Sequence, residues 1–219
     1  MGTTQDNTIY TNCIKEKFTP GYYRQFEQFD EYGNVIYLYK QERANRDNNV
    51  NELLKVNVHN SEGRIIGTII KEGIGCNVLR FSFYDENNQL VKYIEEVTGC
   101  TYISYLFYDK YKNFESRVTL SGKCIDNYLE EFDQFDTRIS HAIFNPCGEN
   151  FYFEYDEQNN LIYKNTRHFF VQVPDIIIKI YDTNNQEINI ANKTLFNNGF
   201  TKIQMFLIIG TIMVPPSSD

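Results

Sequence analysis

The sequence contains no tryptophan, only five prolines and no apolar segment of the roughly 20 residues that a transmembrane helix needs. It also lacks any run of Lys and Arg, and its formal net charge is −8 with a pI near 5.0. Surfaces that bind nucleic acid, or that hold an anionic membrane by charge alone, are basic. The composition therefore argues against a nucleic-acid binder, and electrostatics indicates no particular partner.

Cysteine is present in an odd number and never as a CxxC pair. The N-terminal segment MGTTQDNTIYTNCIKEKF has no apolar core of the kind that a secretory signal contains. Together these features predict free thiols in a reducing, cytoplasmic setting. The five residues are Cys13, Cys76, Cys100, Cys124 and Cys147.

Sequence motifs of catalysis are also missing. The three histidines do not have metal-ligand spacing, and the chain contains no HExxH, no phosphate-binding loop and no GxSxG. The stretch GIGC departs from a dinucleotide fingerprint because Val78 stands where the last glycine is required. We therefore expect the chain not to be an enzyme.

Aromatic residues, in contrast, are abundant, with 17 Tyr and 17 Phe, and both types favour strands. A hairpin repeat accompanies them: an apolar or aromatic residue, then Asp or Asn, then about four polar residues, then strand formers. An Asp or Asn side chain bonds its own backbone two residues on, and Gly or Asn tolerates positive φ, so each unit predicts a hairpin connection. The seven units are centred on Asp30, Asn60, Asp85, Asp109, Asp133, Asp156 and Asp182.

Seven hairpins predict about 12 to 14 strands. A period near 24 residues could also indicate a solenoid, but the units lack a solenoid signature, and up-and-down hairpins close more naturally into an antiparallel barrel or sandwich. No Pro- or Gly-rich linker divides the chain, so one domain is favoured. Residues 41–52, QERANRDNNVNE, form the most polar stretch and are expected to be a long loop.

The C-terminal segment, residues 200–214, reads FTKIQMFLIIGTIMV and is closed by Pro215 and Pro216. A helix that is apolar all round is buried in protein or in lipid. Fifteen residues are short for a bilayer, whereas a barrel of more than about eight strands needs something to fill its bore. We therefore expect this helix to fill the interior of the barrel rather than to span a membrane. The residues expected in this central helix are Phe200, Ile203, Phe206, Leu207, Ile208, Ile209, Ile212 and Met213.

The order of the hairpins and the closing helix resemble the phospholipid scramblase family, whose members are similar to the tubby-like fold. FEQFDEYGNVIYLYKQERA and LLKVNVHNSEGRIIGTIIKEGIGC resemble its two opening hairpins, and the Gly-then-Cys endings at Cys100 and Cys124 resemble those of the next two. The fold class implied is all-β with one central helix: an antiparallel barrel of about twelve strands around a hydrophobic C-terminal helix. The domain would span residues 22–214, between an N-terminal tail or edge segment (1–21) and a C-terminal tail (215–219).

This resemblance implies movement of phospholipids between membrane leaflets, at the cytoplasmic face of the plasma membrane. The membrane would be engaged peripherally or by insertion of the C-terminal helix. The family's dense run of palmitoylated cysteines is reduced to Cys76, so an anchor of that kind is missing and palmitoylation sites are not assigned. The alternative is a soluble tubby-like binding module for lipid headgroups or protein partners, without transport.

Calcium responsiveness is the other property that the resemblance implies, through the loop before the final helix. The matching stretch is DTNNQEINIANK, and the ligands would be Asp182, Asn184, Gln186 and the backbone of Ile188. The twelfth position of such a loop should be a bidentate acid but is Lys193. Asp182 also occupies the turn position of the hairpin repeat, so an ordinary turn is the competing interpretation.

Overall fold

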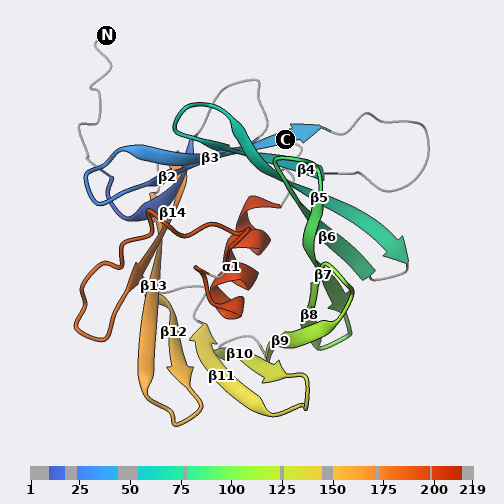
Figure 1. The fold of residues 1–219 in the computed structure, drawn as a ribbon. Coiled ribbons are helices and arrows are strands. Elements are labelled where there is room, and N and C mark those ends of the chain that lie inside the picture. Colours follow the sequence, from blue (N-terminus) through green and yellow to red (C-terminus); the bar gives the residue numbers. More distant parts are fainter. Residues whose placement is uncertain are drawn as a thin grey trace.

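Strands form a closed antiparallel barrel around one short helix in the computed structural model (Figure 1). The structure describes residues 10–17, 24–43, 54–75, 78–123, 126–144, 150–170, 173–197 and 199–213. Each strand pairs with the next along the chain, and the first pairs with the last. The expected all-β fold with a central C-terminal helix is confirmed.

The barrel consists of fourteen strands, slightly more than the twelve that the resemblance implies. The first seven are β1 (Cys13–Lys17), β2 (Gln25–Phe29), β3 (Val35–Arg43), β4 (Leu54–Asn60), β5 (Ile65–Gly75), β6 (Val78–Asp85) and β7 (Leu90–Thr98). The second seven are β8 (Tyr102–Asp109), β9 (Phe114–Lys123), β10 (Asp126–Asp133), β11 (Arg138–Phe144), β12 (Asn150–Asp156), β13 (Leu161–Phe170) and β14 (Val173–Tyr181). The helix is α1 (Lys202–Ile212).

The hairpin repeat forms the turns that the sequence predicts. At Asp30 the carboxylate Oδ1 accepts the backbone N–H groups of Tyr32 at 2.9 Å and Asn34 at 2.8 Å, while Gly33 takes a φ of 82°. A residue at positive φ three positions after the Asp or Asn produces a turn with a bulge, which continues the twist of the strands. The same positive-φ position is filled in the other six turns by Gly63, Asn88, Lys112, Asp136, Asn159 and Asn185.

Strand β1 lies earlier in the chain than the expected barrel start near Tyr22. Cys13 pairs with Lys179 of β14, and Lys15 pairs with Glu27 of β2. This strand therefore closes the barrel from within the segment expected to be a tail or edge. Of the loop expected at residues 41–52, the first three residues continue β3, and the rest lie outside the described residues.

Helix α1 lies along the bore, as Figure 1 shows in a view down the barrel. It is shorter at each end than the expected 200–214, with Thr201 as its N-cap and Met213 as its C-cap. The Thr201 hydroxyl accepts the Gln204 N–H at 3.1 Å, and Gln204 Oε1 accepts the Thr201 N–H at 3.2 Å. This reciprocal capping box fixes the first turn. Six of the eight residues expected in the central helix lie in it, whereas Phe200 and Met213 flank it, and all eight are buried, at 8% exposure or less.

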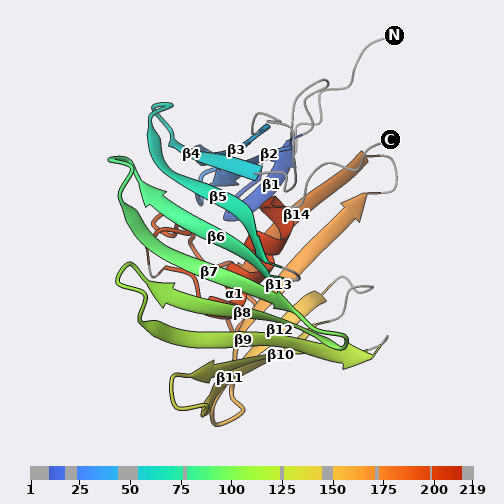
Figure 2. The ribbon, with the colours of Figure 1, turned by 90° about the vertical axis from the view of Figure 1, so that its right-hand side faces the viewer.

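The seven Asp or Asn turns of the hairpin repeat lie at one end of the barrel, and the segment between β14 and α1 packs there (Figure 2). The Gln28 side-chain amide donates to the carbonyl oxygens of Ile190 at 2.8 Å and Lys193 at 2.9 Å. The Phe196 ring packs against Gly67 of β5 and makes an edge contact with Phe83, with ring centroids 5.8 Å apart. The segment is therefore tied to both β2 and β5.

Candidate functional site

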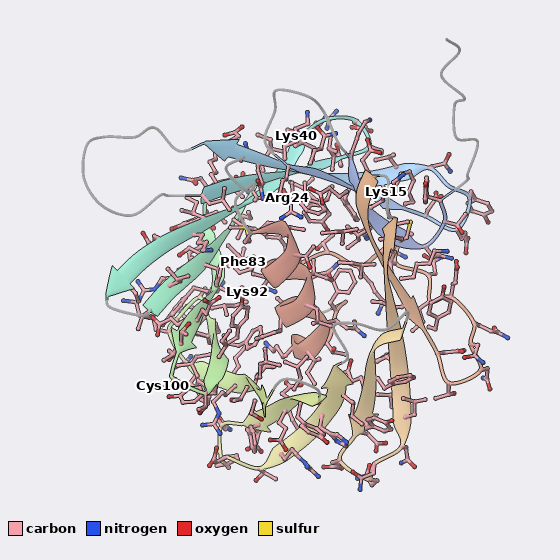
Figure 3. The ribbon with its side chains drawn as sticks, turned by 180° about the vertical axis from the view of Figure 1, so that it is seen from behind. Lys15, Arg24, Lys40, Phe83, Lys92 and Cys100 are labelled. Carbon is pink, nitrogen blue, oxygen red and sulfur yellow. The ribbon has the colours of Figure 1, made fainter. Side chains whose placement is uncertain are left out.

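Three side chains of the barrel wall bind the carbonyl groups at the C-terminal end of α1. Arg24, next to the start of β2, donates to Thr211 O at 3.3 Å, Gln41 of β3 donates to Ile212 O at 2.7 Å, and Lys71 of β5 donates to Met213 O at 3.3 Å. These carbonyls have no partner within a helix, and the two cations also suit the negative end of the helix dipole. Figure 3 shows Arg24 beside this end of the helix.

Acidic side chains face the opposite, N-terminal end of α1. The Thr201 hydroxyl donates to Glu154 at 3.1 Å, and Lys202 forms an ion pair with Glu115. A carboxylate at a helix N-terminus is favourable because the dipole is positive there. Nearby Glu131 accepts a 3.0 Å hydrogen bond from Ser140, yet burial raises the pKa of its carboxyl. Polar side chains of the barrel wall thus bind both ends of α1. A helix that lay in the opposite direction would lose these contacts.

The residues expected to bind calcium form a turn like the others. Asp182 Oδ1 accepts the N–H groups of Asn184 at 2.8 Å and Gln186 at 2.9 Å, and Ile188 N donates to Ile180 O at 2.8 Å. This hydrogen bonding repeats the pattern of Asp30, Asp85 and Asp109. The geometry therefore supports the turn interpretation, and calcium binding stays a prediction.

The thiols differ in their environment. Cys13 is fully buried, and burial raises its pKa to about 12, so its thiolate is scarce at neutral pH. Cys100 is exposed, between β7 and β8 (Figure 3). Cys76, Cys124 and Cys147 lie outside the described residues.

A groove of about 570 Å³ lies on the outer face of strands β7 to β10. The pairing of the strands arranges its lining in three rows across the sheet. One row runs from Tyr102 to Ser121, a second from Val97 through Ser104 and Thr119 to Glu130, and a third from Leu106 through Arg117 to Phe132. The remaining lining residue is Thr101. The volume is in the range of ligand sites in proteins.

Aromatic and cationic side chains dominate one border of this groove. The Arg117 guanidinium lies over the Phe132 ring, 4.7 Å from its centroid, and donates to Asp136 at 2.7 Å. The floor is fixed by a 2.9 Å hydrogen bond between the Ser104 and Thr119 hydroxyls. Tyr102, 44% exposed, forms part of the other border. Large half-exposed aromatic side chains beside an arginine are typical of protein-binding surfaces.

Sequence reasoning did not identify the groove. Its residues stand on four strands, and each alternates with a core residue, as in Tyr105 between Ser104 and Leu106. Only the register of the sheet brings them together. The sequence feature that could have indicated the groove is an apolar residue at an outward-facing strand position, such as Leu106 or Phe132. In a single strand this feature is a weak indication.

Among the described residues, no helix is both long and apolar enough to cross a membrane. In the same part of the chain, no three His, Cys, Asp or Glu side chains are grouped so that they could hold a metal ion.

Comparisons with known proteins leave the family open. No family model matches the chain, and neither the curated proteins nor the solved structures contain a match.

Proposed function

We propose that the chain is a non-enzymatic binding module that engages a protein partner through the groove on β7 to β10. The observation that carries this proposal is the row formed by Leu106, Arg117 and Phe132 on the outer face of the barrel. Tyr and Arg, represented in the groove by Tyr102 and Arg117, are enriched among the residues that contribute most to binding between proteins. The proposal corresponds to the soluble alternative that the tubby-like resemblance implies.

The filled bore supports an outer rather than an inner binding site. The helix side chains that would otherwise meet a ligand, such as Ile203 and Ile208, are fully buried against the barrel wall. Charge also favours a protein over an anionic lipid surface or nucleic acid, because the chain carries a net −8. The outer groove combines apolar area with few charges, which suits a protein segment.

Movement of phospholipids between leaflets is the second candidate, and it rests on the resemblance of the hairpin order and closing helix. Insertion of α1 into a bilayer would require the contacts of Gln41 and Glu154 with the helix to break. A leaflet-exchange assay on vesicles of phosphatidylcholine and phosphatidylserine, with and without calcium, separates the two candidates. We expect exchange equal to that of protein-free vesicles, and calcium-dependent exchange above that level would favour transport.

The binding proposal is tested by comparing three immobilised proteins: the wild type, Leu106→Arg and Ile65→Arg. Ile65 is 47% exposed at the start of β5, so Ile65→Arg is a matched change outside the groove. Extract from cells that express the chain is passed over each protein, and retained proteins are quantified by mass spectrometry. We expect a partner that the wild type and Ile65→Arg retain equally and that Leu106→Arg retains at least tenfold less. Identical retention by all three proteins would contradict the use of the groove.

A further inference from the structure

A row of paired residues crosses the outer face of β6 to β10 at the level of the groove. Arg80 of β6 pairs with Glu95 of β7, which pairs with Leu106 of β8. Leu106 also pairs with Arg117 of β9, which pairs with Phe132 of β10. Paired residues of an antiparallel sheet lie on the same face, so these five side chains, the outer row, all point outward. Figure 2 shows the five strands side by side on one wall of the barrel.

The outer row is complementary to itself in charge when it is centred on Leu106. Glu95 lies one strand to one side of Leu106 and Arg117 one strand to the other, and each step is about 4.8 Å. Two strands away stand Arg80 on one side and Phe132 on the other, a cation and an aromatic ring, which also attract each other. A two-fold axis parallel to β8 and above Leu106 therefore brings each of these groups opposite its complement in a second copy.

We propose that the groove of one chain binds the same groove of a second copy, so that the protein forms a two-fold symmetric dimer. This inference rests on the proposed function, because it identifies the protein partner of the same groove. Each contact occurs twice in such a dimer, since the two copies use the same surface. Leu106 of one copy packs against Leu106 of the other, and each Glu95 faces the Arg117 of the other copy.

The ion pairs within each chain are compatible with these contacts. Arg80 binds Glu95 at 2.7 Å, and Arg117 binds Asp136 at 2.7 Å. The side chains of Arg80 and Arg117 remain 35% and 36% exposed, so both have free surface. A guanidinium carries five N–H donors, and Arg117 can therefore bind Asp136 and the Glu95 of a second copy together. The charges along each contact then alternate in sign.

The net charge of −8 does not oppose this contact, because the negative charge is concentrated at the turns. The five residues of each turn, counted from its Asp or Asn, together include eleven Asp and Glu but three Lys and Arg. The outer row has one acidic and two basic residues. Barrel strands tilt by about 35–45° from the barrel axis, so two copies related by an axis along β8 would cross at roughly twice that angle. Their acidic turn ends then point away from each other.

Tyr102 extends the central contact along β8. It lies on the same strand as Leu106 and is 44% exposed, so the axis above β8 also places Tyr102 opposite Tyr102 of the second copy. Aromatic pairs contribute to binding beyond the area that they bury. Between these two contacts, the hydroxyl groups of Ser104 and Thr119 line the floor of the groove. They can bind water trapped between the copies, as is usual in protein interfaces.

The first test is sedimentation velocity of the purified full chain at concentrations up to about 100 μM. We expect the wild type to shift from the chain mass of 25.9 kDa to twice that mass as its concentration rises. Leu106→Arg places two like charges at the axis and should raise the Kd of the dimer at least tenfold. Ile65→Arg, outside the groove, should leave the Kd unchanged. A wild type that stays monomeric at the highest concentration would overturn the inference.

Two charge reversals then test the contact between Glu95 and Arg117. Glu95→Arg brings two cations together at each contact, and Arg117→Glu brings two anions together, so each variant alone should dimerise at least tenfold more weakly than the wild type. An equimolar mixture of the two variants restores opposite charges at both contacts of a heterodimer. We expect the mixture to dimerise at least tenfold more tightly than either variant alone. Such rescue requires both variants to be folded, and its absence would count against the dimer.

These results are separable from those of the extract experiment. A purified wild type that is monomeric, but that retains a different protein through the groove, overturns the dimer and leaves the proposed function supported. A dimer that Leu106→Arg forms as tightly as Ile65→Arg uses another surface and also overturns the inference.

Discussion

The Gln41 side-chain amide donates a 2.7 Å hydrogen bond to the carbonyl oxygen of Ile212, the last residue of α1. The two residues are 171 positions apart in the chain, and both are buried. A buried carbonyl at a helix end requires a donor, and the third strand of the barrel supplies it. The contact joins the helix to the wall of the bore by a polar interaction that apolar packing cannot replace.

Replacing Gln41 should therefore destabilise the protein. In Gln41→Ala the Ile212 carbonyl is left without this donor, and an unsatisfied buried acceptor costs about 1–3 kcal/mol. The free energy of unfolding, measured with urea, checks this value. Gln89→Ala, at an exposed turn position, is the control and should change stability by less than about 0.5 kcal/mol. Equal effects of the two changes would argue against the polar contact.

Lys112 should be a position at which glycine stabilises the fold. It has a φ of 70°, where the equivalent residues of the other turns are Gly, Asn or Asp. A side chain with a Cβ is strained in this region, so Lys112→Gly should stabilise the protein by about 0.5–1 kcal/mol. Thermal unfolding measures the gain. The neighbouring change Lys110→Gly relieves no such strain, and a gain there of the same size would contradict the explanation.

The pH dependence of stability should report the lowered pKa of Lys92. The pKa of the Lys92 amino group is near 10.5 in the unfolded chain and, because of burial, about 8 in the folded protein, so between these pH values the unfolded chain binds more protons. Stability should therefore increase as the pH rises from 8 to 10.5. Lys92→Met removes this effect, so it should be more stable than the wild type at pH 7, by roughly 1–3 kcal/mol, and lose that advantage by pH 10.5.

Urea unfolding at several pH values between 7 and 10.5 makes this comparison. Lys55→Met is the control, because Lys55 is 40% exposed and paired with Glu42. An advantage of Lys92→Met that stays constant across this range would show that the titration of Lys92 does not cause it.

Gly67 should not tolerate a methyl group. A Cβ on Gly67 would lie 2.5 Å from the Phe196 ring, so Gly67→Ala should destabilise the protein by about 1–3 kcal/mol. In a Phe196→Ala background the same change should cost much less, since the clash is absent. In contrast, Gly210→Ala adds a Cβ within α1 that meets only the Tyr105 hydroxyl, at an ordinary contact distance of 3.9 Å, and should be neutral or stabilising. Denaturant unfolding of the four variants provides the test, and additive effects of Gly67→Ala and Phe196→Ala would refute the contact.

The turns were predictable from the sequence because each is determined within five residues. The Asp30 side chain bonds backbone groups two and four positions on, so no distant partner is required. The burial of residues such as Ile208 was predictable for another reason: a helix that is apolar all round has no face for water.

Strand β1 and the groove were not predictable in the same way. Cys13–Lys17 is a five-residue strand whose pairing with β14 depends on residues more than 150 positions away. The row from Leu106 to Phe132 exists only when three strands are in register. Long-range register decides both features, and local sequence patterns carry little information about it.

The pairing of Cys13 with Lys179 has a consequence for synthesis on the ribosome. Strand β1 can pair with β2 early, but it cannot pair with β14 until Tyr181 has been translated, and the helix that fills the interior emerges after β14. Until then the growing sheet presents unpaired edges and an uncovered apolar face, both of which promote association between nascent chains. Closure of the barrel is therefore expected to wait for the synthesis of β14 and to benefit from a chaperone that shields the open sheet.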